Sequence, residues 1–370
     1  MFFSLARFRD LRFPCHTQLG VWTLNHDRGW QQHDDGVVKT LGACNDDLGF
    51  WTQFHVTDRV VQLRHARLRG YPLWWDADHQ VLTNLAGQGQ AIWADQQVDI
   101  AGDQLVITQI DIIGAVTGKT LTIADAVQTL SDVICNKIAV LYDHTPQWTK
   151  CHFETGGVDT AIIKAALVST NREFHALDFE HFEYDAFTNA TKDILREHYW
   201  AYRQIHHWRD PTIFLTGSGG DEFLMRGPTT LALWAAWHDI DLASVLCQRQ
   251  GYHVAYFLRE KNLAIIKRHW QQRQQIQELY PNYRDLVWQI CNMNANDHQH
   301  WHLGNTFTWS PYHDLELTKI MLSLGPDDLL DHAIDATVTK RVIESLCPGQ
   351  LTTLATDKNL HSRSRLPVYG

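Results

Sequence analysis

The sequence lacks the features of a membrane or exported protein. No window approaches the roughly 18 consecutive apolar residues that a membrane helix requires. The apolar stretch at the N-terminus is interrupted by Arg7 and Arg9 and is shorter than the hydrophobic core of a signal peptide. These absences predict a soluble cytoplasmic protein without a membrane partner.

Cysteine pairs and an excess of basic residues are also missing. The seven cysteines are odd in number and form no C-x-x-C pair, which predicts reduced thiols and no structural zinc site. The 32 basic residues are scattered and outnumbered by 42 acidic ones, which gives a formal charge of −10. Such a chain has no broad surface for a phosphate backbone, so the charge disfavours nucleic acid and favours small-molecule chemistry.

The 370 residues, 44% of them hydrophobic, suffice for two domains with proper cores. Up to about residue 118, short apolar stretches alternate with turn signals such as residues 76–78, which is typical of antiparallel strands. Apolar residues then recur at helical spacing behind a Thr122 cap, at Ile123, Val127, Leu130, Ile134, Ile138 and Leu141. We therefore predict a smaller β-rich domain over residues 1–118 and a second domain over residues 119–370.

The second domain alternates strand-like and helix-like segments. Strands are expected at residues 151–153, 174–177 and 213–215, with helices at 160–168 and 190–207. This alternation predicts an α/β fold with a parallel sheet flanked by helices. After residue 229 the pattern is mostly helical, with amphipathic stretches at 231–237, 258–276 and 315–324, whereas residues 292–297 are expected to form a loop.

Two glycine-bearing turns stand out from this background. Residues 155–160 read Thr-Gly-Gly-Val-Asp-Thr between a strand and a helix, and residues 216–222 read Thr-Gly-Ser-Gly-Gly-Asp-Glu after the strand at 213–215. Glycines let backbone N–H groups approach an anion, and a helix N-terminus adds partial positive charge. Taken singly, each turn is more simply a tight connection between a strand and a helix.

The two turns together favour a shared binding site. If both follow neighbouring parallel strands, they face one crevice at the carboxyl ends of the sheet, where ligands bind in open α/β folds. Asp159 and Asp221 are then placed to hold Mg²⁺ on a pyrophosphate group. The residues predicted to bind the phosphates are Thr155, Gly156, Gly157, Val158, Asp159, Thr160, Gly217, Ser218, Gly219, Gly220 and Glu222.

These motifs resemble those of a known family. Residues 155–160 are similar to the Ser-Gly-Gly-x-Asp-Ser loop of the N-type ATP pyrophosphatases, with threonine in place of both serines. Residues 216–222 resemble the Ser-Gly-x-Gly-x-Asp-Glu signature of asparagine synthetases and their relatives, the β-lactam synthetases and lasso-peptide cyclases. The resemblance implies an ATP-pyrophosphatase type of parallel sheet, with ATP and Mg²⁺ as cofactors.

Other stretches extend the resemblance. Residues 64–84 are similar to a passage of the glutaminase domain that precedes the synthetase domain, and residues 310–314 to a segment before a core helix. Residues 340–358 resemble the closing segment that supplies the family's catalytic lysine. This implies catalytic roles for Lys358 and Lys340, although without the resemblance each lysine is more simply a solvated surface charge.

Two departures from the family pattern narrow the implied function. Phe2 stands where a working glutaminase has its nucleophilic cysteine, so the first domain is expected to be a degenerate glutaminase-like scaffold. Ser218 stands where asparagine synthetases usually carry Glu. The implied activity is an ATP-dependent, AMP-forming carbon–nitrogen ligase that adenylates a small-molecule or peptide carboxylate, releases pyrophosphate and transfers the acyl group to an amine or ammonia.

Alternatives to this activity stay open. One is a non-catalytic nucleotide-binding relative that acts as a sensor or subunit, and another is an ammonia-dependent asparagine synthetase. The resemblance also leaves a homodimer open. His298, His300 and His302 share one face if they lie on a strand, which is compatible with zinc, but no convincing fourth ligand follows and a polar surface or pocket lining is favoured.

Overall fold

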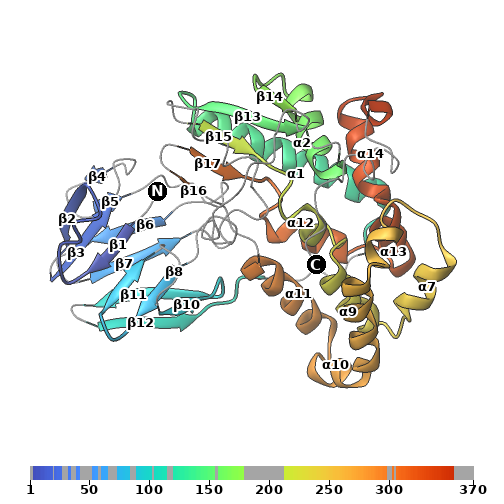
Figure 1. The fold of residues 1–370 in the computed structure, drawn as a ribbon, viewed down its shortest axis with the longest axis horizontal. Coiled ribbons are helices and arrows are strands. Elements are labelled where there is room, and N and C mark those ends of the chain that lie inside the picture. The colour runs from blue at the N-terminus through green and yellow to red at the C-terminus, as the bar shows by residue number, and fades with distance from the viewer. Residues whose placement is uncertain are drawn as a thin grey trace.

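A computed structural model gives the fold of the chain. It describes residues 3–19, 21–26, 32–34, 39–41, 52–56, 60–65, 73–83, 89–101, 104–114, 120–154, 157–178, 212–297, 302–303 and 306–353. The described part is mixed α/β, with antiparallel strands in its N-terminal region and a parallel sheet flanked by helices after them (Figure 1). The expected β-rich N-terminal region and the expected parallel sheet flanked by helices are thereby confirmed.

The N-terminal region contains two six-stranded antiparallel sheets. Their orders are β10-β8-β9-β1-β3-β2 and β12-β11-β7-β6-β5-β4. The strands are β1 (Phe3–Ala6), β2 (Cys15–Leu19), β3 (Trp22–His26), β4 (Gln32–Asp34), β5 (Lys39–Leu41), β6 (Thr52–Val56), β7 (Val60–His65), β8 (Leu73–Asp76), β9 (Val81–Thr83), β10 (Gln90–Ile92), β11 (Gln96–Ala101) and β12 (Gln104–Gln109). A small core joins the sheets, because Leu63 and Val98 of the second sheet cluster with Leu5, Trp22 and Leu82 of the first.

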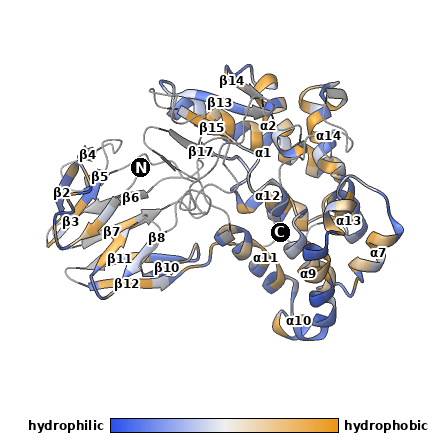
Figure 2. Ribbon diagram, viewed as in Figure 1, coloured by the Kyte–Doolittle hydropathy of each residue, from blue (hydrophilic) through white to orange (hydrophobic). Residues whose placement is uncertain are grey.

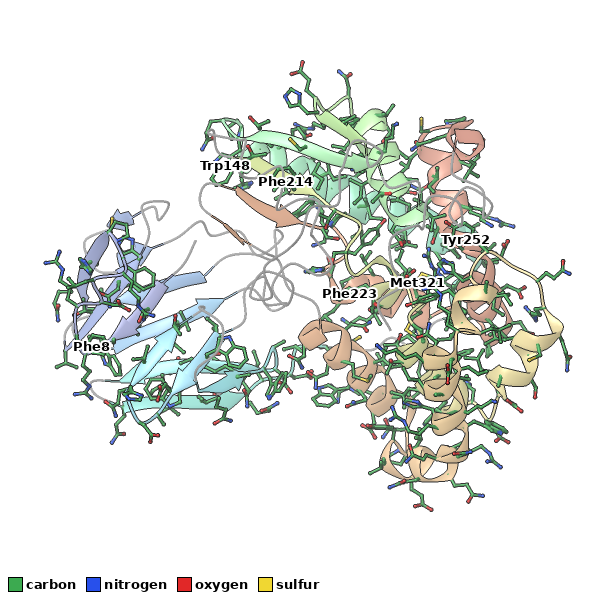
Figure 3. The ribbon with its side chains drawn as sticks, in the orientation of Figure 1. Phe8, Trp148, Phe214, Phe223, Tyr252 and Met321 are labelled. Atoms are coloured by element: carbon green, nitrogen blue, oxygen red, sulfur yellow. The ribbon has the colours of Figure 1, made fainter. Side chains whose placement is uncertain are left out.

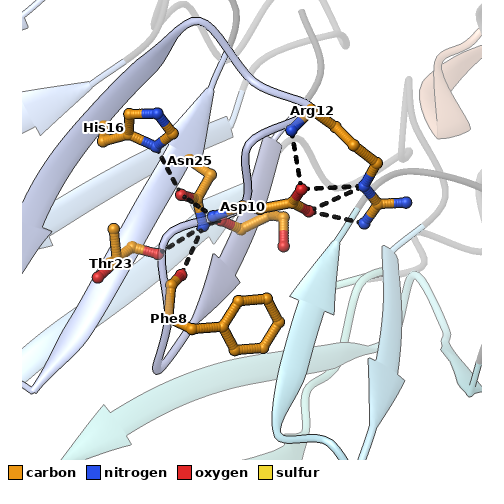
Figure 4. A network of polar contacts seen from close by, with 7 residues as sticks. Phe8, Asp10, Arg12, His16, Thr23 and Asn25 are labelled. Carbon is orange, nitrogen blue, oxygen red and sulfur yellow. Dashed lines mark hydrogen bonds and ion pairs between the residues drawn. The ribbon is translucent and has the colours of Figure 1, made fainter.

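A polar network lies beside this core. The side chain of Asn25 accepts hydrogen bonds from the Asp10 backbone N–H at 2.8 Å and from His16 at 2.8 Å (Figure 4). Its amide nitrogen donates to the carbonyls of Ser4, Phe8 and Thr23 at 3.2 to 3.3 Å. Asn25 is fully buried, and both polar ends of its carboxamide have partners. It therefore fixes the segment between β1 and β2 against β3.

The change from strands to helices falls between β12 and helix α1 (Ile123–His144). Thr122 caps α1, since its hydroxyl accepts from the Asp125 N–H while the Asp125 carboxylate reaches back to Thr122. Among the predicted apolar positions, Leu130, Ile134, Ile138 and Leu141 are fully buried. The cap and the periodicity of this helix are thus confirmed, whereas the division into two domains stays a prediction.

The central sheet of the C-terminal region has the order β14-β13-β15-β17-β16. Its strands are β13 (Thr149–Glu154), β14 (His175–Asp178), β15 (Thr212–Leu215), β16 (His302–Leu303) and β17 (Thr306–Trp309). All neighbours are parallel except β16, which pairs antiparallel with β17. In Figure 2 hydrophobic colour dominates β15, all of whose residues are buried. Such a continuous apolar strand is what a sheet covered on both faces requires.

Helices surround this sheet and extend beyond it. They are α2 (Val158–Ser169), α5 (Gly220–Phe223), α6 (Pro228–Trp237), α7 (Leu242–Gln248), α8 (Val254–Phe257), α9 (Glu260–Gln271), α10 (Arg273–Leu279), α11 (Tyr283–Asp297), α12 (Leu315–Leu322), α13 (Pro326–Asp335) and α14 (Thr337–Leu346), followed by a 3₁₀ turn at Gln350–Thr353. The stretch expected at 258–276 is two helices, α9 and α10, which meet at Gln272. Within the described part of the chain, none of the helices has the length and apolar character needed to cross a membrane.

One local expectation was wrong. Residues 292–297 belong to α11 and are not a loop. Asparagine has a weak helix propensity, but tertiary contacts override it here. The Asn294 side chain donates to the Glu222 carbonyl at 3.0 Å and to the Thr318 hydroxyl at 3.1 Å, while Asn296 accepts from the Ala94 N–H at 2.9 Å. The helix expected at 190–207 and the histidines at 298 and 300 lie outside the described residues.

Candidate functional site at the carboxyl ends of the parallel strands

The candidate site lies where three parallel strands end. Strand β13 leads into α2, β15 into α5 and β17 into α12, and the three strands are neighbours in the sheet. The next strand in the chain after β13 is β14, on one side of it, while β15 lies on the other side. This reversal of strand order is a topological switch point, the usual ligand-binding position in open α/β sheets. Both glycine-bearing turns follow the strands that border it.

The first turn begins α2. Gly157 is the N-cap residue, and Val158 and Thr160 are buried in the first turn of the helix. The Thr160 hydroxyl donates to the Gly157 carbonyl at 3.1 Å, so its proton is used within the turn. Two of the residues predicted to bind phosphate, Thr155 and Gly156, lie outside the described residues.

The second turn fits against the first because its glycines have no side chains. A Cβ on Gly220 would lie 2.5 Å from Cγ of Asp159, and one on Gly217 would lie 3.1 Å from Cβ of Asp159. Gly219 has φ of +77°, a left-handed conformation that favours glycine. The structure therefore brings together two turns that lie far apart in the sequence. In Figure 3, the labelled residues Phe214 on β15 and Phe223 on α5 lie before and after the second turn.

A buried arginine joins the two aspartates that these turns supply. Nη2 of Arg226 lies 2.5 Å from Oδ1 of Asp221 and 3.2 Å from Oδ2 of Asp159. Nη1 of Arg226 donates to the Thr339 hydroxyl of α14 at 3.3 Å. The Arg226 side chain has no exposed surface, whereas 19% of Asp159 and 28% of Asp221 is exposed. The guanidinium is thus fully buried beside two aspartate side chains that are partly exposed.

The charges in this cluster shift one another. Burial raises the pKa of Asp159 above its usual range, and the Arg226 guanidinium opposes that shift. Burial lowers the pKa of Arg226, but the carboxylates of Asp159 and Asp221 outweigh burial and raise it above its ordinary value. Burial, together with the charge of Arg226, lowers the pKa of His253 to about 4, so its imidazole is neutral at pH 7.

Several buried atoms of this cluster make no hydrogen bond. These atoms are Oδ1 of Asp159, Nε of Arg226 and Nε2 of His253, the last of which lies 4.0 Å from Oδ1 of Asp221. Buried polar groups usually have partners, and exceptions are frequent where a ligand or ion completes the set. Within the described part of the chain, the cluster therefore has polar atoms that no protein group satisfies.

The segment after β17 holds both turns in place. The Tyr312 hydroxyl donates to the Asp159 carbonyl at 2.6 Å, and the Ser310 hydroxyl donates to the Ser218 carbonyl at 2.7 Å. Tyr312 is fully buried, and the His313 ring packs on Phe223 with a centroid distance of 5.5 Å. Residues 310–314 thus hold the two turns together. The family resemblance of this segment did not predict that role.

The remaining predicted residues are arranged as follows. The Glu222 carbonyl accepts from Asn294, and Cγ of Glu222 packs close to Gly227. Lys340 pairs with Asp335 at 2.8 Å and lies over the Tyr252 ring at 5.4 Å. It is one residue from Thr339, so it is close to the cluster but already has an acidic partner. Lys358 lies outside the described residues.

Sequence reasoning missed Arg226, Tyr312 and His253 as members of the site. Arg226 carried a signal, since it is the single charge in an apolar run that follows Asp221 and Glu222. A charge in such a run is buried only if it is paired. Tyr312 lies in the segment 310–314 that resembles a family passage, but that resemblance gave it no role, and His253 carried no signal.

The donor set is compatible with Mg²⁺ bound together with a nucleotide. Mg²⁺ usually takes one or two carboxylates and completes its shell with phosphate oxygens and water. Asp159 and Asp221 supply two carboxylates, and Oδ1 of Asp159 has no other partner. Over the described ranges no cluster of three or more His, Cys, Asp or Glu side chains could hold a metal ion. Phosphate and water would have to supply the other ligands.

Neither a scan against models of known families nor a search of curated proteins found a match to this sequence.

Proposed function

We propose that the protein is an ATP-dependent, AMP-forming carbon–nitrogen ligase of the kind that its motifs resemble. One observation carries the proposal. The two turns that resemble the pyrophosphate loop and the Asp-Glu signature interlock at Gly220 and bring Asp159 and Asp221 onto one nitrogen of Arg226. A chance similarity in two separate turns gives no reason for the turns to meet at the switch point of one sheet.

The chain's own groups suit the binding of a polyphosphate. Gly217 and Gly219 let the second turn pack closely against its neighbours, and the N-terminus of α2 adds partial positive charge to the first turn. Mg²⁺, when bound, would neutralise the leaving pyrophosphate. Asp159 and Asp221 would hold it, with Lys358 as the cation for charge that develops on the reacting acyl group. Positioning of the α-phosphorus against the carboxylate then supplies much of the catalysis.

The test is pyrophosphate release from ATP over a panel of small carboxylic acids and peptides, each with ammonia or a primary amine. We expect release with at least one pair, and a loss of about 100-fold or more in Asp159→Asn and Asp221→Asn, because both remove a carboxylate from the phosphate site. Asp239→Asn is a matched control, since Asp239 is an exposed carboxylate that pairs with Arg273. No release by the wild-type protein over the whole panel would contradict the proposal.

A second candidate is a nucleotide-binding protein without turnover. The pairing of Lys340 with Asp335 favours it, because a lysine with an acidic partner is less available to pyrophosphate. Calorimetry separates the two candidates. A sensor binds ATP and leaves it intact during overnight incubation with the substrate panel, whereas a ligase converts it to AMP.

A further inference from the structure

Arg226 occupies the place between Asp159 and Asp221 where a metal ion bound by both carboxylates would lie. Its Nη2 contacts one oxygen of each carboxylate, Oδ2 of Asp159 and Oδ1 of Asp221. A metal ion that bridged the aspartates through these oxygens would take the same place. Among the described residues of the cluster, Oδ1 of Asp159 is the buried carboxylate oxygen without a hydrogen bond.

The surroundings hold the guanidinium in this position. Arg226 is fully buried, and the Thr339 hydroxyl accepts from its second nitrogen. The backbone is fixed as well, since the Arg226 and Gly227 N–H groups both donate to the Asp221 carbonyl, at 2.5 and 2.8 Å. An arginine anchored at both its backbone and its side chain loses little freedom when it pairs with carboxylates.

The cation also changes the charge that a metal ion would meet. When both carboxylates are ionised, Asp159 and Asp221 alone present two negative charges, and Arg226 reduces their sum to one. At the few ångströms that separate these groups, one unit of charge changes the attraction for a divalent ion by well over a factor of ten, even in a polar protein environment. A free metal ion is therefore disfavoured, whereas a nucleotide brings phosphate oxygens that restore the missing negative charge.

We propose that Arg226 is the positioning residue of this site, which holds Asp159 and Asp221 near each other and keeps the two oxygens it contacts from a divalent ion that arrives without nucleotide. The part of this inference that concerns ATP rests on the proposed function. It assigns the site a binding order in which the metal ion enters as a complex with ATP.

The experiment measures metal binding and needs no activity. Mn²⁺ replaces Mg²⁺, and the electron paramagnetic resonance signal of free Mn²⁺ is followed during titration of the full chain without nucleotide. We expect weak binding by the wild-type protein and at least about tenfold tighter binding by Arg226→Gln, which removes the charge. Arg226→Lys keeps the charge and is expected to resemble the wild type.

A surface variant controls for the change in net charge. Arg273→Gln makes the same change at a pair with the exposed Asp239 and should leave Mn²⁺ affinity at the wild-type value. If Arg226→Gln does not fold, Thr339→Val gives a smaller version of the test, because it is nearly isosteric and removes one partner of the guanidinium. Tighter Mn²⁺ binding by Thr339→Val supports the proposal, and an unchanged affinity counts against it.

The outcomes separate this inference from the proposed function. The role of Arg226 is overturned if the wild-type protein binds Mn²⁺ tightly without nucleotide, or if Arg226→Gln gains no affinity for Mn²⁺. Either result holds whatever the protein does with ATP. Calorimetry with ATP, in Mg²⁺ and in EDTA, tests the other half. Absence of ATP binding under both conditions overturns the proposed function and the binding order, while the metal titrations still decide whether Arg226 guards the carboxylates.

Discussion

Two buried polar networks, one around Asn25 and one around Arg226, differ in how completely their groups are paired. Both polar ends of Asn25 have partners, and Asp10 next to it is bound by Arg12 through two guanidinium nitrogens (Figure 4). In the Arg226 network, buried atoms of Asp159, Arg226 and His253 lack hydrogen bonds. Within the described residues, the Asn25 carboxamide is fully paired, although the buried Ser4 hydroxyl beside it is not, whereas three residues of the Arg226 network each leave a charged or titratable atom without a hydrogen bond.

The difference indicates where to look for chemistry in this chain. Unsatisfied buried groups cost free energy, so a protein keeps them where a ligand uses them or where strain is tolerated for another reason. The Asn25 network is expected to contribute to stability alone. The Arg226 network is expected to contribute to stability and to binding, and the following variants test that distinction in order of expected effect.

The largest effect is expected from Arg226→Met. It leaves Asp159 and Asp221 without their buried cation, and removal of one partner of a buried ion pair typically costs about 3 to 5 kcal/mol. Urea unfolding monitored by tryptophan fluorescence gives the loss in the free energy of unfolding. A loss below about 1 kcal/mol would mean that the two carboxylates do not depend on Arg226.

Asn25→Ala breaks the other network. It leaves the Asp10 N–H and three carbonyls without their partner, so the free energy of unfolding should fall by about 2 to 3 kcal/mol. Affinity for Mg-ATP, measured by calorimetry on folded protein, should stay at the wild-type value. A loss of affinity would show that the two networks are coupled and would end the comparison.

The pH dependence of stability gives a further test of the Arg226 network, through the neighbouring His332. Burial, together with the nearby charge of Arg226, lowers the pKa of His332 to about 3, while its Nε2–H donates to the Leu224 carbonyl and its Nδ1 accepts from the Val338 N–H. Because the folded pKa lies below the ordinary value of 6.5, the unfolded chain binds more protons in acid. The free energy of unfolding therefore falls as the pH drops below about 6.5, by about 2 kcal/mol for this residue at pH 5.

The measurement is urea unfolding of the wild type and His332→Gln at pH 8, 6.5 and 5. The variant keeps a donor for Leu224 and removes the titration, so the gap between the two proteins should narrow as the pH falls. A constant gap would mean that His332 does not contribute to acid destabilisation.

The smallest effect is expected outside both networks. Thr122→Ala removes the capping box of α1 and should lower the free energy of unfolding by about 1 kcal/mol. Thr122→Ser keeps the hydroxyl and serves as its control. Neither variant should change nucleotide affinity or the pH dependence, and a change in either would contradict a purely local role.

Local patterns in the sequence predicted the parts of this structure that are determined locally. The cap at Thr122, the apolar spacing of α1 and the glycines of the two turns are properties of neighbouring residues. The helix at residues 292–297 was missed because Asn294 obtains its partners from α5 and α12. The pairing of Arg226 with Asp159 joins residues on different elements, and no period within the sequence encodes it.

The partners of Arg226 also make the cluster a reporter of folding. Its side chain binds one aspartate after β13, a second after β15 and a threonine on α14. These elements meet only when most of the C-terminal region has assembled, so a partly folded chain has no site to offer. Any ligand of the site would bind only the assembled state and would stabilise it by mass action. The amount of ligand bound would thus measure the fraction of fully folded molecules in a preparation.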